Sequence, residues 1–333
     1  SFFTDLFSKD SITHLKAQQA LSDVYFGEEG EHKIMDALHK IKLADNEYYA
    51  IKTKLIAELG YIKDTSKCVV VNHLKEIYEQ TADTSIFQNE VIIALARHKS
   101  SDAIKLFKEL VLQEPPVFEK EYNYSTLFSS LEDSLSLATI LYPELLQLTA
   151  LQDYKAPVIS LLVKLVDSGY IKGTQYENYF NKIYFDAKLA LKKQQGKEEK
   201  KMADNKIKED SEDDDVAMIR NYNNNYDNDE LGDYTTLLMP FYESNSNVPR
   251  YFDKLLRSRD ENICMNTVTT LLHHNKPVPD SILTELAAKD RTRGSLFTKL
   301  EKIKRLDKFP EKYKTQLDVA RSFLLAKKKY PFR

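Results

Sequence analysis

Glycine and proline are unusually scarce in this chain, and their scarcity limits the folds that it can adopt. There are 8 glycines and 10 prolines among 333 residues, about 5% of the chain where roughly 12% is usual. A β-sandwich needs many tight turns and a phosphate-binding loop needs glycine's conformational freedom, so both are disfavoured. Apolar residues make up 42% and charged residues 30% of the chain, which indicates a globular protein. No apolar run approaches the roughly 18 residues that cross a membrane.

Apolar residues recur at helical spacing along most of the length. One stripe occupies residues 51–62 in steps of three and four, and the next occupies residues 69–78. Short polar segments such as residues 99–102 separate the stripes and supply Asp, Ser or Thr, whose side chains cap the free N–H groups of a helix. Connections this short favour antiparallel neighbours. The sequence therefore predicts an all-α fold built from antiparallel helical hairpins.

The predicted hairpins repeat at intervals of 27 to 41 residues, which is typical of helical repeat arrays. They begin near Ser11, Asn46, Thr84 and Ser125, and again near Asp233, Asp260 and Arg293. A short echo supports the repeat interpretation, because GYIKDT at 60–65 returns as GYIKGT at 169–174. We expect the glycine to end a helix in the left-handed conformation in both copies. These features predict an irregular right-handed α-solenoid of the HEAT/armadillo kind.

The middle of the chain interrupts the array. Residues 192–233 hold few large aliphatic side chains, so they cannot bury enough surface to offset their ordering entropy. We therefore predict an amino-terminal array at 1–195, an acidic Asn/Asp-rich linker or insertion at 196–230, and a carboxy-terminal array at 231–333.

Charge is distributed unevenly along the sequence. Residues 198–233 carry thirteen acidic and five basic side chains, a net charge of −8, whereas residues 291–333 carry fourteen basic and four acidic ones, a net charge of +10. Blocks of opposite sign can dock to each other or serve different partners. The simpler interpretation is that both blocks are solvated surface.

Most catalytic templates are absent from the sequence. GxGxxG, GxxxxGK[ST], HExxH, GxSxG and an EF-hand loop do not occur. His32, Asp36 and His39 share one face of a predicted helix and form a conceivable metal-binding set, but no fourth ligand is evident, so an ordinary exposed face is the simpler interpretation. His14, His73 and His98 each have an acidic residue one turn away, which predicts surface pairs. We expect no catalytic residue, cofactor or metal.

A candidate interaction surface combines basic residues near the carboxy-terminal end with tyrosines of the linker. Its members are Lys302, Arg305, Lys312, Lys314, Arg321, Tyr222 and Tyr226. The cations could follow a phosphate backbone, although an i,i+4 ion pair between Glu301 and Arg305 is a simpler use of such residues. Tyrosine supplies rigid contact area with a polar tip, but we expect most tyrosines of the chain to pack between helices.

Neither end nor the cysteines identify a compartment. The chain begins at Ser1, and its first residues lack a cationic segment followed by an apolar one, so any secretory signal is expected upstream. Cys68 and Cys264 belong to no CxxC pair, which disfavours a disulfide scaffold and a cysteine zinc site.

Three segments resemble a known family. LYPELL at 141–146, YKAPVI at 154–159 and LVDSGYIK at 165–172 are similar to the helical extension of long TraB/GumN-family bacterial proteins. The resemblance implies an exported protein, in the periplasm or cell envelope, of which this chain is an accessory region. The hydrolytic domain of that family is marked by GxxH. None of the 8 glycines here has histidine three positions later, so no catalytic residue is carried over.

These observations predict a non-catalytic helical-repeat scaffold that binds another protein or a sibling domain of the same chain. One alternative is a nucleic-acid-binding repeat protein that uses the basic carboxy-terminal segment, in which case a cytoplasmic location is expected. A second alternative is a helical metal-dependent hydrolase. The sequence does not predict the partner or the oligomeric state.

Overall fold

The computed structural model describes residues 2–20, 30–40, 48–62, 69–81, 85–118, 122–207 and 230–328. These residues form helices and connecting turns and contain no strand, so the prediction of an all-α fold is confirmed for them.

The helices divide between two compact units, unit 1 (Ser1–Ile171) and unit 2 (Lys172–Arg333). Unit 1 contains α1 (Phe2–Leu6), α2 (Ser11–Ala20), α3 (Gly30–Lys40), α4 (Tyr49–Leu59), α5 (Val69–Gln80), α6 (Ser85–Arg97), α7 (Ser101–Gln113), α8 (Tyr122–Glu132), α9 (Leu135–Ala138) and α10 (Gln152–Asp167). Unit 2 contains α11 (Phe180–Ile207), helical residues 230–238, α13 (Asn247–Leu256), α14 (Glu261–His273), α15 (Asp280–Ala288), α16 (Asp290–Lys302) and α17 (Gln316–Lys328).

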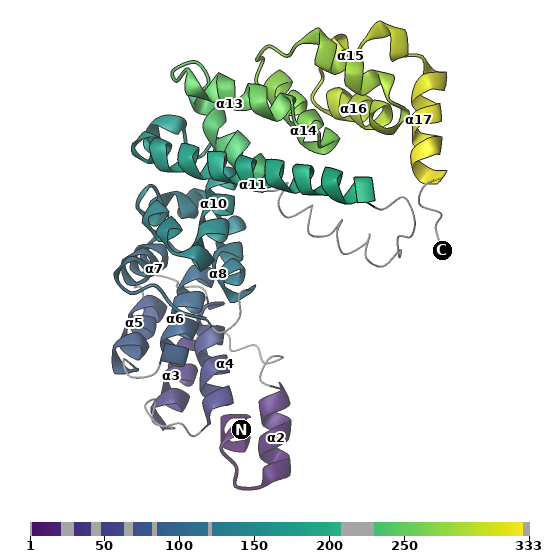
Figure 1. The fold of residues 1–333 in the computed structure, drawn as a ribbon. Helices are drawn as coiled ribbons and strands as arrows, with labels where there is room; N and C mark the ends of the chain where they lie inside the picture. The colour runs from purple at the N-terminus through teal and green to yellow at the C-terminus, as the bar shows by residue number, and fades with distance from the viewer. Residues whose placement is uncertain are drawn as a thin grey trace. The chain divides into compact units, whose positions relative to one another are not determined.

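Helices of unit 1 pack mainly against helices that are close to them in the sequence (Figure 1). Helix α6 is central, because it contacts α4, α5, α7 and α8. Its Val91, Ala94 and Leu95 are fully buried. Farther along, the rings of Phe107 and Phe128 meet edge to face at 6.3 Å, which joins α7 to α8. The core of the unit is therefore a series of local interfaces.

Helix caps form, as predicted, at a serine and an aspartate that each precede an apolar helical stripe. Ser100 accepts a hydrogen bond from the backbone N–H of Ala103 at 3.2 Å, at the start of α7. Asp260 accepts one from the N–H of Asn262 at 2.9 Å, at the start of α14. Each side chain satisfies an N–H group that the helix itself leaves unpaired.

The two glycines of the echo have different roles. Gly169 follows α10 with φ of 74°, as predicted, and the N–H of Tyr170 donates to the carbonyl of Leu165 to close the helix. Gly60 has φ of −65°, so the predicted left-handed conformation is wrong for this copy. A Cβ at Gly60 would lie 2.8 Å from the carbonyl oxygen of Ala94, which shows that glycine is needed here for the close approach of α6.

Helix α11 belongs to unit 2, although the sequence puts the end of the amino-terminal array at residue 195. The hydroxyl of Tyr176 donates to the carbonyl of Leu237 at 2.9 Å, and the rings of Phe180 and Phe241 lie 4.9 Å apart. Near the other end of α11, Glu198 accepts a hydrogen bond from the Ser258 hydroxyl at 2.7 Å. The compact units therefore divide between Ile171 and Lys172. Of the expected linker, residues 196–207 continue α11 and residues 208–229 lie outside the described part of the chain.

Arg293 joins α15, α16 and α17, which lie side by side in Figure 1. This side chain is only 7% exposed. Its guanidinium donates to the carbonyl oxygens of Ala287 at 2.7 Å and Ala288 at 2.9 Å, both at the end of α15. It also donates to Asp290 Oδ1 at 2.6 Å and to the carbonyl of Asp318 at 3.3 Å. A buried charge with this many partners holds three helix ends together.

Substitution of Gly60 tests the close approach of α6. Gly60→Ala is expected to lower the free energy of unfolding by about 2 kcal/mol, because its methyl group meets backbone atoms that cannot move aside. Gly196→Ala is the opposite control, since nothing lies within 4 Å of the added Cβ in mid-helix, and it should stabilise by about 0.5–1 kcal/mol. Urea unfolding followed by circular dichroism measures both; a neutral Gly60→Ala would contradict the close approach.

Replacement of Arg293 tests the junction of α15, α16 and α17. Arg293→Met is expected to cost about 3 kcal/mol, because it leaves buried carbonyls and Asp290 without their donor. Arg291→Met is the matched control, since Arg291 is 71% exposed and pairs with Glu261 at the surface. The control should change stability by less than about 1 kcal/mol. Equal losses in the two variants, measured by thermal unfolding, would exclude this role for Arg293.

Candidate functional sites

Arg305 of the candidate interaction surface is engaged within unit 2. Its Nη1 donates to the carbonyl of Leu272 at 2.6 Å and to Asn275 Oδ1 at 3.0 Å, at the end of α14. The expected pair with Glu301 does not form, because α16 ends at Lys302 and Lys304 turns the chain with φ of 58°. Arg305 thus satisfies carbonyl groups that α14 leaves unpaired, which makes it a structural residue.

The other basic residues of the candidate surface differ in whether an acidic side chain pairs with them. Lys314 pairs with Glu311 at 2.8 Å, and Arg321 lies 3.7 Å from Asp290. Lys302 and Lys312 are exposed and form no ion pair with any described residue. The nearby Lys304 and Lys308 are also exposed and Lys299 is partly exposed, and none of the three forms an ion pair with a described residue. A lysine-rich segment at 299–312 therefore remains, with Lys299 and Lys302 one turn apart on α16.

The tyrosines of the candidate surface, Tyr222 and Tyr226, lie outside the described residues. Elsewhere the described tyrosines differ in burial: Tyr124, Tyr176 and Tyr234 are buried, whereas Tyr61 and Tyr170 are exposed. Burial raises the pKa of Tyr176 and Tyr234 far above the usual value, so both phenols stay neutral. These rings contribute packing and hydrogen bonds within their own units.

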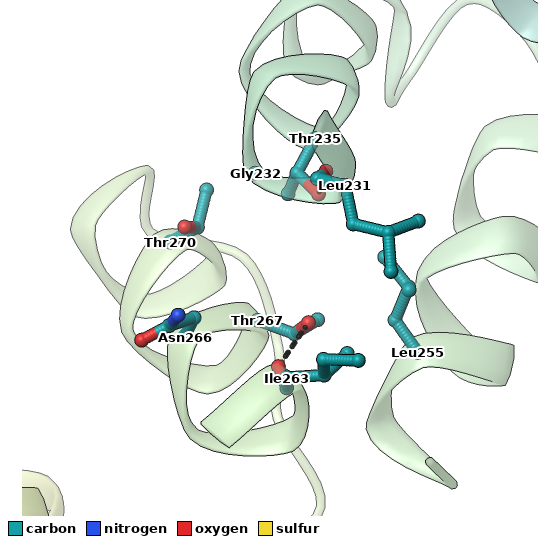
Figure 2. A pocket seen from close by; sticks show the side chains of 8 residues that line it. All are labelled: Leu231, Gly232, Thr235, Leu255, Ile263, Asn266, Thr267 and Thr270. Atoms are coloured by element: carbon teal, nitrogen blue, oxygen red, sulfur yellow. Dashed lines mark hydrogen bonds between the residues drawn. The ribbon is translucent and has the colours of Figure 1, made fainter. Parts of the chain in front are cut away.

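Figure 2 shows a small cavity in unit 2, between helical residues 230–238, α13 and α14. Thr235 and Thr267 approach it from opposite sides, and their hydroxyls donate to the carbonyls of Leu231 at 2.6 Å and Ile263 at 2.8 Å. The cavity has a volume of about 30 Å³, enough for one or two water molecules. Small-molecule sites are roughly tenfold larger, so this cavity does not accommodate a substrate in the observed conformation.

Two large apolar side chains are exposed on α11. Phe185 is 61% exposed and Leu189 is 53% exposed, and their i,i+4 spacing makes them neighbours on the helix. Lys188 and Lys192 are also exposed on this helix, and the ammonium of Lys188 lies 5.3 Å from the ring centre of Tyr184. The result is an apolar pair beside positive charge, called the α11 surface below. Helical periodicity predicts neighbours of this kind, but does not indicate which face of α11 is buried.

Histidines of α3 and α5 gather around one carboxylate in unit 1. Glu76 Oε1 lies 3.4 Å from His39 Nε2, and Glu76 Oε2 lies 3.8 Å from His73 Nδ1. The rings of His32 and His73 are 6.4 Å apart. The predicted pair of His73 with Glu76 is therefore present, whereas the His14 ring instead faces the carbonyl of Leu6 at 2.8 Å. The predicted surface position of His98 is wrong, because this residue is only 6% exposed and its Nδ1 lies 3.0 Å from Ser100 Oγ. Sequence spacing identified the α3 histidines, but not that α5 lies beside them.

Cys264 is a buried structural thiol. Its Sγ donates to the carbonyl of Leu256 at 3.2 Å, and burial raises the pKa of the thiol to about 11. At neutral pH it is protonated and therefore a poor nucleophile. Cys68 lies outside the described residues.

Comparison with known proteins yields no family assignment: no family model, curated protein or solved structure matches the chain. The resemblance to TraB/GumN proteins and to HEAT/armadillo repeats stays a prediction. Among the described helices, none is both long enough and apolar enough to span a bilayer.

Proposed function

We propose that the chain is a helical-repeat scaffold that binds another protein, and that the helices form an irregular solenoid of stacked hairpins. The packing of successive helices in unit 1 supports this proposal, since helices such as α5 and α7 bury an apolar stripe against sequence neighbours and leave their other face in solvent. Such an array offers far more surface than enclosed volume.

The α11 surface is the observation that carries the proposal. Phe185 and Leu189 expose most of their apolar side chains, although burial of each would contribute about 1.5–3 kcal/mol. Aromatic and aliphatic anchors next to cations are typical of the centre and rim of a protein interface. The partner that fits is an amphipathic segment with apolar residues on one side and carboxylates beside them, because Lys188 and Lys192 flank the pair.

Photo-crosslinking from position 185 tests the proposed partner surface. A photoreactive phenylalanine analogue is introduced at Phe185 of the full chain in its native cells, and a second variant carries it at the exposed Ser295 of α16 as a control. We expect a discrete adduct with another protein, or with a sibling domain, from position 185 only. Leu189→Asp should lower its yield at least tenfold, because it puts a charge in the apolar contact.

The same experiment has clear contrary outcomes. Equal adducts from positions 185 and 295, or an adduct that Leu189→Asp leaves unchanged, would refute the α11 surface as the binding site. Far-UV circular dichroism of the Leu189→Asp chain checks that it remains folded, which is expected because Leu189 is half exposed.

A second candidate function is binding of nucleic acid by the lysine-rich segment at 299–312. Five lysines there form no ion pair with described residues, and such groups release counterions when they bind phosphates. Arg305 is not part of this candidate, because it is engaged at the end of α14.

Salt-dependent binding of a labelled duplex DNA tests this candidate. If the segment binds phosphates, affinity should fall more than tenfold between about 50 and 200 mM salt. Lys302→Glu with Lys308→Glu should abolish it, whereas Lys254→Glu, an exposed change on α13, should not. An affinity that is insensitive to salt, or equally sensitive to both sets of changes, would exclude the segment as a nucleic-acid site.

A further inference from the structure

We propose that the partner of the α11 surface is an α-helix, and that its backbone comes closest to α11 at Gly196. This inference rests on the proposed function, because it specifies what binds beside Phe185 and Leu189. The helix that fits carries apolar side chains at every third or fourth position, with Asp or Glu along the edges of that stripe. It belongs to another protein or to a sibling domain of the chain.

Gly196 lies in the interior of α11, where the helix itself has no need of glycine. Among the described glycines, Gly169 is the one with a positive φ, so Gly196 keeps ordinary helical geometry. Nothing lies within 4 Å of a Cβ built at Gly196, whereas a Cβ at Gly60 would meet a neighbouring backbone. Glycine in mid-helix is less stable than alanine. The described part of the chain therefore gives no structural reason for glycine at this position.

Gly196 shares the exposed stripe of α11 with the apolar pair. At 3.6 residues per turn, positions 185, 189, 192 and 196 fall within about 60° of the helix circumference. Phe185, Leu189 and Lys192 are exposed, and Gly196 follows Phe185 by about 16 Å along the axis. A helix that packs at a small crossing angle contacts all four positions. Because Gly196 has no side chain, the two helix axes can come close together there.

Cations border the stripe and define the chemistry of its partner. Lys188, Lys192 and Lys200 are exposed and form no ion pair with a described residue. Glu199 is exposed beside them, so the face as a whole is positive. Carboxylates on an approaching helix would pair with these ammonium groups, whereas a basic helix would be repelled. An anionic lipid surface would also attract the lysines, but it needs no space at Gly196, so the glycine favours a helix.

Photo-crosslinking of Gly196 variants tests the inference. The photoreactive phenylalanine analogue stays at position 185 of the full chain in its native cells, and Gly196→Ala or Gly196→Leu is added. We expect the adduct yield to fall at least fivefold with Ala and twentyfold with Leu, because the added side chain keeps the two helices apart. Both are better helix formers than glycine, so the urea midpoint should rise while binding weakens. A purely structural role of Gly196 would not give this combination.

Matched controls separate the stripe from the rest of unit 2. Gly232→Ala should leave the adduct unchanged, since Gly232 lies in helical residues 230–238 and nothing lies within 4 Å of its added Cβ either. Lys192→Glu should lower the yield at least tenfold, because it repels carboxylates of the partner. Lys254→Glu, an exposed change on α13, should have no effect.

Mass spectrometry of the adducts tests whether the partner is a helix. The analogue is also introduced at positions 181 and 189, which are exposed one turn on either side of position 185. The crosslinked residues of the partner should then advance by three or four positions at each step, in one direction.

The contrary outcomes distinguish this inference from the proposed function. An adduct that Leu189→Asp removes but Gly196→Leu leaves unchanged would overturn the inference alone. Crosslinked residues without helical spacing, or an adduct with lipid or with a second copy of the chain, would also overturn it. The absence of any adduct from position 185 would refute the proposed function and this inference with it.

Discussion

The burial of one apolar stripe by each short helix is the interaction on which the rest of the structure depends. Most helices here have 9 to 16 residues, a length at which an isolated helix is marginal in water. Their stability therefore comes from the neighbours in the sequence, as where α6 packs on α4, α5, α7 and α8. Because helices depend on close contact with their neighbours, a small residue such as Gly60 is needed where α6 approaches. In unit 2, the buried Arg293 is stabilised by the carbonyl groups and the carboxylate that it binds where three helix ends meet.

Local signals in the sequence predicted local features well. The 3.6-residue period predicted the helices, and Ser100 and Asp260 cap the helices that they precede. Gly169 ends α10 in the left-handed conformation as expected. Gly60 was misinterpreted because the same six-residue pattern also arises where a neighbouring backbone, that of Ala94, comes too close for a side chain. A pattern read along the chain does not contain that contact.

The candidate sites depend on longer-range packing, which the sequence indicated only in part. Spacing placed His32, Asp36 and His39 on one face, but the contact of α3 with α5, which adds His73 and Glu76, is a tertiary feature. Arg305 was expected on a binding surface, yet it pairs with the end of α14, 30 or more residues earlier. Conversely, residue type alone would predict that Phe185 and Leu189 are buried. They are exposed because a different face of α11 packs against the rest of its unit.

Hydrogen exchange measured along the full chain after Leu55→Ala tests the central claim, that helices are stabilised by their sequence neighbours. Leu55 is fully buried in α4, and its truncation should cost about 2–5 kcal/mol. The account predicts faster exchange in α3 to α7, with α13 to α16 unchanged. Faster exchange throughout both units would show that the chain unfolds as a single cooperative body, and would contradict an array stabilised by local interfaces.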